Sequence, residues 1–81
     1  MPMMARFYFD FHDDSGILRD NVGEELPSLT VALREAMETV GDAVKDLTFQ
    51  QSEGRIVVEV RDGEGPVLKV SAVIETTNLK E

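Results

Sequence analysis

The sequence predicts an α+β fold in which an antiparallel sheet is covered on one face by a single helix. Two pairs of segments rich in alternating or β-branched residues flank one long segment with helical apolar spacing. The expected order is therefore strand, strand, helix, strand, strand. Because strands and helices do not alternate one by one, this order disfavours a parallel, doubly wound sheet. We expect one domain over residues 1–81, with residues 1–4 and 76–81 frayed.

The first hairpin is expected over residues 6–20. Its first strand, residues 6–12, alternates phenylalanines with polar residues, which is typical of a half-buried strand. The inward residues are Phe7, Phe9 and Phe11, and they predict an aromatic ridge in the core. Short polar side chains and a glycine at residues 13–16 favour a tight turn, and a short strand over residues 17–20 completes the hairpin.

A connection over residues 21–27 leads to the expected helix, for which Ser28 is the N-cap. Apolar residues then recur at three-and-four spacing in one stripe. Its members are Leu29, Leu33, Ala36, Met37, Val40, Ala43, Val44 and Leu47. Gly41 costs about 1 kcal/mol in a helix interior, and we interpret it as a point of close packing against the sheet.

The second hairpin is expected from a strand over residues 55–61, a turn over 62–66 and a strand over 67–74. The last strand has apolar residues on both sides: Leu68, Val70, Ala72 and Ile74 on one, Val67 and Val73 on the other. An edge strand of this kind is a candidate pairing surface, which favours a homodimer. One helix leaves the other sheet face open, with Arg6, Tyr8, Asp10, His12, Glu59 and Arg61 as expected members.

Charge and composition exclude several classes of partner. The formal charge is −8, from 16 acids against 8 bases, and the bases are scattered singly along the chain. Such a field repels phosphates, so we expect no nucleic-acid partner and no anionic membrane partner. The chain has no cysteine, signal-like segment or membrane-length apolar run, which together predict a soluble, cytoplasmic protein.

The first half of the chain resembles a known family. Residues 6–20 combine an aromatic strand, an acidic turn with glycine, and Arg19-Asp20; Gly23-Glu24-Glu25-Leu26-Pro27 and an alanine-containing helix follow. This pattern is similar to a domain of unknown function found in small uncharacterised bacterial proteins. The resemblance is looser over the second hairpin. It implies the same order of elements and a bacterial origin, and it implies no activity.

The candidate site residues are Asp10, His12, Asp13, Asp14 and Arg19, around the first hairpin. Carboxylates and an imidazole could bind a small ligand or a divalent cation. However, the spacing does not match a calcium loop, since Ser15 and Asn21 occupy the positions of its glycine and its glutamate. A solvated acidic turn and a surface histidine explain most of these residues, and Arg19 can pair with an acid across the hairpin. We assign no catalytic residue, no metal and no cofactor.

Three functions remain open at this point. The leading hypothesis is a noncatalytic interaction or structural module whose partner is itself, as a homodimer, or another protein. The first alternative is a small-ligand or divalent-cation binder that uses the acidic turn. The second alternative is an enzyme whose site forms across a dimer interface.

Overall fold

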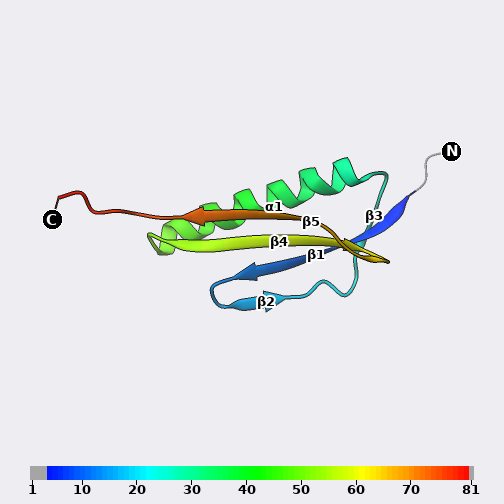
Figure 1. Ribbon diagram of the computed structural model, residues 1–81, viewed down its shortest axis with the longest axis horizontal. Helices are drawn as coiled ribbons and strands as arrows, with labels where there is room; N and C mark the ends of the chain where they lie inside the picture. Colours follow the sequence, from blue (N-terminus) through cyan, green and yellow to red (C-terminus); the bar gives the residue numbers. More distant parts are fainter. Residues whose placement is uncertain (1–3, 81) are drawn as a thin grey trace.

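The computed structural model describes residues 4–80 and has an antiparallel sheet with one helix on one face (Figure 1). The elements in chain order are β1 (Ala5–Asp13), β2 (Gly16–Leu18), β3 (Glu24–Leu26), α1 (Leu29–Gln50), β4 (Gly54–Asp62) and β5 (Gly65–Ile74). The strand order is β2-β1-β4-β5, and β3 pairs with the beginning of β1. The predicted α+β class, an antiparallel sheet with one helix on one face, is confirmed, although three strands rather than two precede the helix.

The segment before the helix differs from the prediction. The second strand ends at Leu18 rather than at Asp20, and part of the expected connection forms β3. Leu26 pairs with Ala5 and is buried, so β3 contributes to the core. The physical reason is that β2 and β3 both pair with β1. Between them the chain leaves the edge of β1 in a loop, which side-chain hydrogen bonds hold in place.

The helix begins as predicted and ends later. The Ser28 hydroxyl accepts a hydrogen bond from the Val31 N–H at 3.2 Å, which makes it the N-cap. The helix continues to Gln50, beyond Leu47, the last member of the predicted apolar stripe. The interpretation of Gly41 was wrong: it lies on the exposed side of α1, where an added Cβ would meet no atom within 4 Å.

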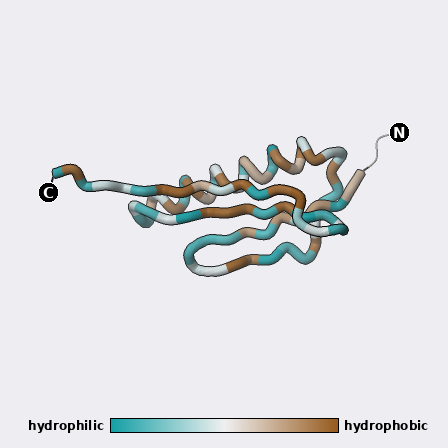
Figure 2. Tube along the Cα trace, in the orientation of Figure 1, coloured by the Kyte–Doolittle hydropathy of each residue, from teal (hydrophilic) through white to brown (hydrophobic). Residues whose placement is uncertain are grey.

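The core lies between α1 and the sheet. Its buried members are Phe7, Leu26, Ala32, Ala36, Val40, Ile56, Val58 and Val60, with Phe9 and Phe11 packed against them. In Figure 2 the apolar colouring is most continuous along β4 and β5, on which α1 packs. The predicted phenylalanine ridge is confirmed. The predicted helix stripe is only partly covered, because Leu29, Leu33 and Met37 stay exposed.

The register of the sheet confirms the expected open face. Tyr8 pairs with Arg61 and Asp10 with Glu59, and cross-strand partners share one face of a sheet. This face is opposite to the phenylalanines, and α1 does not cover it.

The chain beyond β5 has no regular structure from Glu75 to Lys80, but it is attached at one point. The Thr76 hydroxyl donates to the Ser52 carbonyl at 2.6 Å. The expected fraying of residues 1–3 and 81 falls outside the described residues. Within residues 4–80, no helix has the length and apolar content needed to cross a membrane.

Candidate functional site

The polar centre of the open sheet face is an ion pair between β1 and β4. Arg61 donates from Nε to Asp10 Oδ2 at 2.8 Å, and its Nη2 donates to the Asp20 carbonyl at 2.6 Å. The guanidinium lies over the Tyr8 ring, 4.5 Å from the ring centroid. Asp10 is only 2% exposed because these groups cover it, although its face of the sheet has no helix.

Asp20 organises the loop between β2 and β3. Its Oδ1 accepts from the N–H groups of Val22 and Gly23, both at 3.0 Å, and its Oδ2 accepts from the Phe9 N–H at 3.0 Å. Its own N–H donates to Asp10 Oδ1 at 2.9 Å. Asp20 therefore binds the amides of the loop, and Asp10, Asp20 and Arg61 form one connected network.

Electrostatics keep this network charged. Burial opposes ionisation of Asp10, but hydrogen bonds from Arg61 and the Asp20 N–H outweigh burial and lower the Asp10 pKa. Burial likewise opposes ionisation of Asp20, and hydrogen bonds from Gly23, Phe9 and Val22 bring its pKa below the ordinary value. The hydrogen bond to Asp10 raises the pKa of Arg61. A general acid or base needs a pKa near the working pH, so these groups are suited to structure rather than proton transfer.

The acidic turn uses its carboxylates locally. Asp13 Oδ1 accepts from the Ser15 N–H at 2.8 Å and from the Ser15 hydroxyl at 2.6 Å, which lowers the pKa of Asp13. Asp14 Oδ2 accepts from the Arg55 N–H at 3.3 Å, which ties the turn to the start of β4. The turn is therefore built by its own acids, as in an Asx turn.

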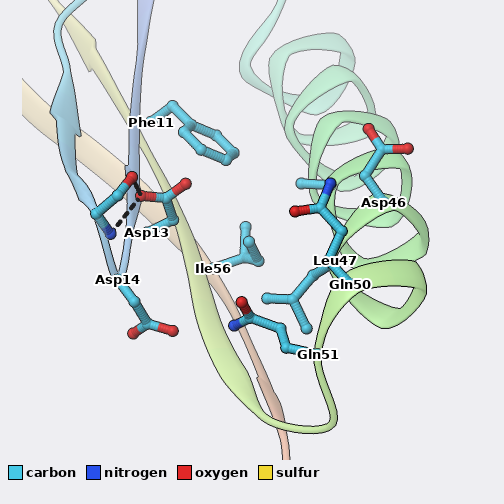
Figure 3. A pocket seen from close by; sticks show the side chains of 10 residues that line it. Phe11, Asp13, Asp14, Asp46, Leu47, Gln50, Gln51 and Ile56 are labelled. Carbon is cyan, nitrogen blue, oxygen red and sulfur yellow. Dashed lines mark hydrogen bonds between the residues drawn. The ribbon is translucent and has the colours of Figure 1, made fainter.

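Two open hollows border this turn. The larger, of about 490 Å³, lies between the first hairpin and the end of α1. Figure 3 shows Phe11, Leu47 and Ile56 at its apolar base, with Asp13, Asp14 and Asp46 around it. The smaller, of about 330 Å³, lies on the open face and is lined by His12, Asp13, Asp14, Arg55, Val57, Glu59 and Lys69.

The structure divides the sequence-predicted site residues into two groups. His12, Asp13 and Asp14 line the smaller hollow together, whereas Asp10 is enclosed beneath Arg61. Arg19 is exposed and acts on Asp10 only as a nearby charge. Within residues 4–80, no group of three or more His, Asp or Glu side chains is placed to hold a metal ion.

Sequence reasoning placed Arg61 on the open face and Asp20 at the end of the second strand, but it did not join them to Asp10. The signal was present in the strand register, since pairing Tyr8 with Arg61 brings the guanidinium beside Asp10. That register depends on contacts between residues 51 positions apart, which periodicity alone does not fix.

Gly23 shows why the loop sequence suits this site. Its φ of +76° is a left-handed conformation, and an added Cβ would lie 2.8 Å from the Tyr8 ring and 2.9 Å from Arg6 Cγ. Arg6 in turn pairs with Glu25 on β3 at 3.0 Å. The glycine therefore allows the loop to pack against the open face beside Tyr8.

A family model described as Domain of unknown function (DUF6894) matches residues 6–73. The chain belongs to this family. The match confirms the resemblance drawn from residues 6–27, and it extends over the second hairpin as well. Comparisons with curated proteins and with solved structures find no match. In this DUF6894 chain, the segment between β2 and α1 is held in place by Asp20, Gly23 and Leu26. The motif over residues 19–27 that resembles the family therefore has a structural explanation.

Proposed function

We propose that this protein is a noncatalytic interaction module of the bacterial cytoplasm that pairs with a second copy of itself through the free edge of β5. The observation that carries the proposal is the position of β5. It is the last strand in the sheet order, it is 10 residues long, and among the described residues its strand partner is β4 alone. An edge strand presents unpaired N–H and C=O groups that can pair with another strand.

The two halves of β5 differ in how well they are protected against pairing with another strand. Pro66 and a register shift opposite Val60 and Arg61 interrupt the beginning of the strand, and such features discourage edge pairing. The last charged residue of the strand is Lys69. Residues 70–74 are uncharged, and Val73 is 58% exposed. The second half of β5 is therefore the part most suited to pairing.

The noncatalytic part of the proposal is supported by the use of the carboxylates. Those of Asp10, Asp13 and Asp14 accept hydrogen bonds that build the sheet face and the turn. These hydrogen bonds explain why the first hairpin is rich in acids, because the carboxylates help to build the fold.

The test is the solution mass by light scattering over a range of concentrations. We expect a species of twice the 9.0 kDa chain mass, and we expect Val73→Lys to shift it to the monomer. Ile17→Lys is the matched control, because Ile17 is exposed on the same sheet face but lies on β2, at the other side of the sheet. A wild-type monomer at every concentration up to about 1 mM, or equal dissociation by both variants, would contradict the proposal.

A further inference from the structure

The larger hollow, between the first hairpin and the end of α1, has an apolar base that the helix leaves open. α1 packs mainly on β4 and β5, so Phe11 on β1 lies at the margin of the covered area and is only half-buried. Leu18 pairs with Phe11, shares its sheet face and is 72% exposed. Leu47 and Ile56 complete the base (Figure 3). Covering apolar surface of this kind is favourable, so the base suits an apolar group of a ligand.

The rim of the hollow carries charge of one sign. Asp13 and Asp14 lie on the hairpin side and Asp46 on the helix side (Figure 3). Among the described residues that line the hollow, none is a lysine, an arginine or a histidine. Neither of the two ion pairs found within residues 4–80 includes one of these three acids. A cleft with apolar walls and charge of one sign focuses the electric field, so this hollow attracts cations.

The hydrogen bonds of the turn hold two of these carboxylates in place without neutralising them. Asp13 accepts from the N–H and the hydroxyl of Ser15, and Asp14 accepts from the backbone N–H of Arg55. All of these donors are uncharged, so both negative charges remain. The bonds to Ser15 also lower the pKa of Asp13, which keeps that carboxyl ionised at neutral pH.

We propose that this hollow binds a small organic cation that has an apolar body, such as a primary alkylamine. The apolar body lies on Phe11, Leu47 and Ile56, and the ammonium group donates to the carboxylates of the rim. The volume of about 490 Å³ falls within the range of small-molecule sites, about 300–1,000 Å³. Charge complementarity and the apolar base therefore point to the same class of ligand.

A bare metal ion fits the hollow less well. Within residues 4–80, no three acids or histidines converge as a metal site requires, and an ion would leave the apolar base uncovered. The inference also does not depend on the proposed pairing of two copies. The hollow lies beside β1, and β4 separates β1 from β5 in the sheet.

The first test is an NMR titration of the wild-type protein with n-hexylammonium, n-hexanol and methylammonium. n-Hexanol keeps the apolar chain without the charge, and methylammonium keeps the charge without the chain. We expect n-hexylammonium to bind at least about tenfold more tightly than either, and to shift the methyl signals of Leu47 and Ile56. Equal affinity for n-hexylammonium and another probe would overturn the inference. Shifts at Val57, in the smaller hollow, in place of Leu47 and Ile56 would also overturn it.

The second test compares Asp46→Asn with Glu64→Gln, each of which removes one negative charge. Glu64 is the matched control because it is exposed in the turn between β4 and β5, at the other end of β4 from Ile56. We expect Asp46→Asn to raise the n-hexylammonium dissociation constant about threefold. We expect Glu64→Gln to change it less than about 1.5-fold, because salt screens a distant charge. Equal effects of the two variants would overturn the inference.

The third test fills the hollow without changing its charge. Ala43 lines the hollow and is half-buried, so Ala43→Leu places a larger side chain there. Val44→Leu is the control, since Val44 is half-buried on the same helix and does not line the hollow. We expect Ala43→Leu to abolish n-hexylammonium binding and Val44→Leu to preserve it, with circular dichroism to check folding. Undiminished binding by folded Ala43→Leu would overturn the inference. If Ala43→Leu does not fold, the comparison of Asp46→Asn with Glu64→Gln decides.

Discussion

Arg61 Nε lies 2.8 Å from Asp10 Oδ2, on a sheet face that no helix covers. The pair buries a carboxylate on the side of the sheet that was expected to be exposed to solvent. It also joins the first hairpin to β4. Through the Asp20 N–H and carbonyl, it also fixes the loop that leads to β3 and α1.

Removal of the Asp10 carboxylate should therefore destabilise the fold. We expect Asp10→Ala to lower the free energy of unfolding by about 3 kcal/mol, because Arg61 and the Asp20 N–H lose their acceptor. Urea denaturation measures this. Glu59→Ala is the control, since Glu59 is the cross-strand neighbour of Asp10 without a hydrogen bond to Arg61. Equal losses in the two variants would argue against the network.

The lowered pKa values of Asp10 and Asp20 predict acid sensitivity. For a carboxyl whose pKa is lower in the folded state, the stabilisation is complete above the ordinary value of 3.8 and is lost as pH falls through the folded value. We expect the urea midpoint to fall as the pH drops below the ordinary carboxyl value of 3.8. Asp20→Asn should be less stable at neutral pH and should show a shallower decline. A decline parallel to that of wild type would contradict this role of Asp20.

Glu35 should show the opposite dependence. A hydrogen bond with Glu24, burial and the charges of Glu24 and Glu38 raise its pKa above 4.5. The folded state then disfavours the ionised form, so the penalty is complete above the raised pKa and absent below the ordinary one. We expect Glu35→Gln to raise the melting temperature at pH 7, with no gain at about pH 4. Glu53→Gln, in the loop before β4, is the control and should change little at either pH.

Gly23 should tolerate no side chain. We expect Gly23→Ala to lower the free energy of unfolding by at least about 1–2 kcal/mol, because its φ is positive and Tyr8 and Arg6 occupy the space of a Cβ. Gly63→Ala is the control, since an added Cβ there meets no atom within 4 Å. Thermal unfolding of the two variants compares them directly, and a similar melting temperature for both would refute this account of the loop.

Local patterns were sufficient for most of the fold. The alternation of Phe7, Phe9 and Phe11 placed β1 and its inner face, and Ser28 marked the start of the helix. These features depend on neighbouring residues, so sequence spacing reports them. β3 was missed because its residues 24–26 are too few for a periodic signal, and a loop held by Asp20 separates it from β2.

The candidate site was less predictable for a physical reason. Alternation placed Asp10 and His12 on one face, but the burial of Asp10 depends on Arg61 from a distant strand. Helical spacing also could not show how much of the stripe the sheet covers. The exposure of Leu33 and Met37 follows from the position of α1 over the sheet, which only the tertiary structure defines.

Hydrogen exchange along β5 tests the pairing of two copies most directly. In a monomer, alternate amides of an edge strand point to solvent and exchange rapidly, whereas in an edge-paired dimer those amides are protected. We expect protection of all amides over residues 70–74 in concentrated wild-type protein, and its loss at alternate positions in Val73→Lys. Rapid exchange of alternate amides over residues 70–74 in concentrated wild-type protein would contradict the account.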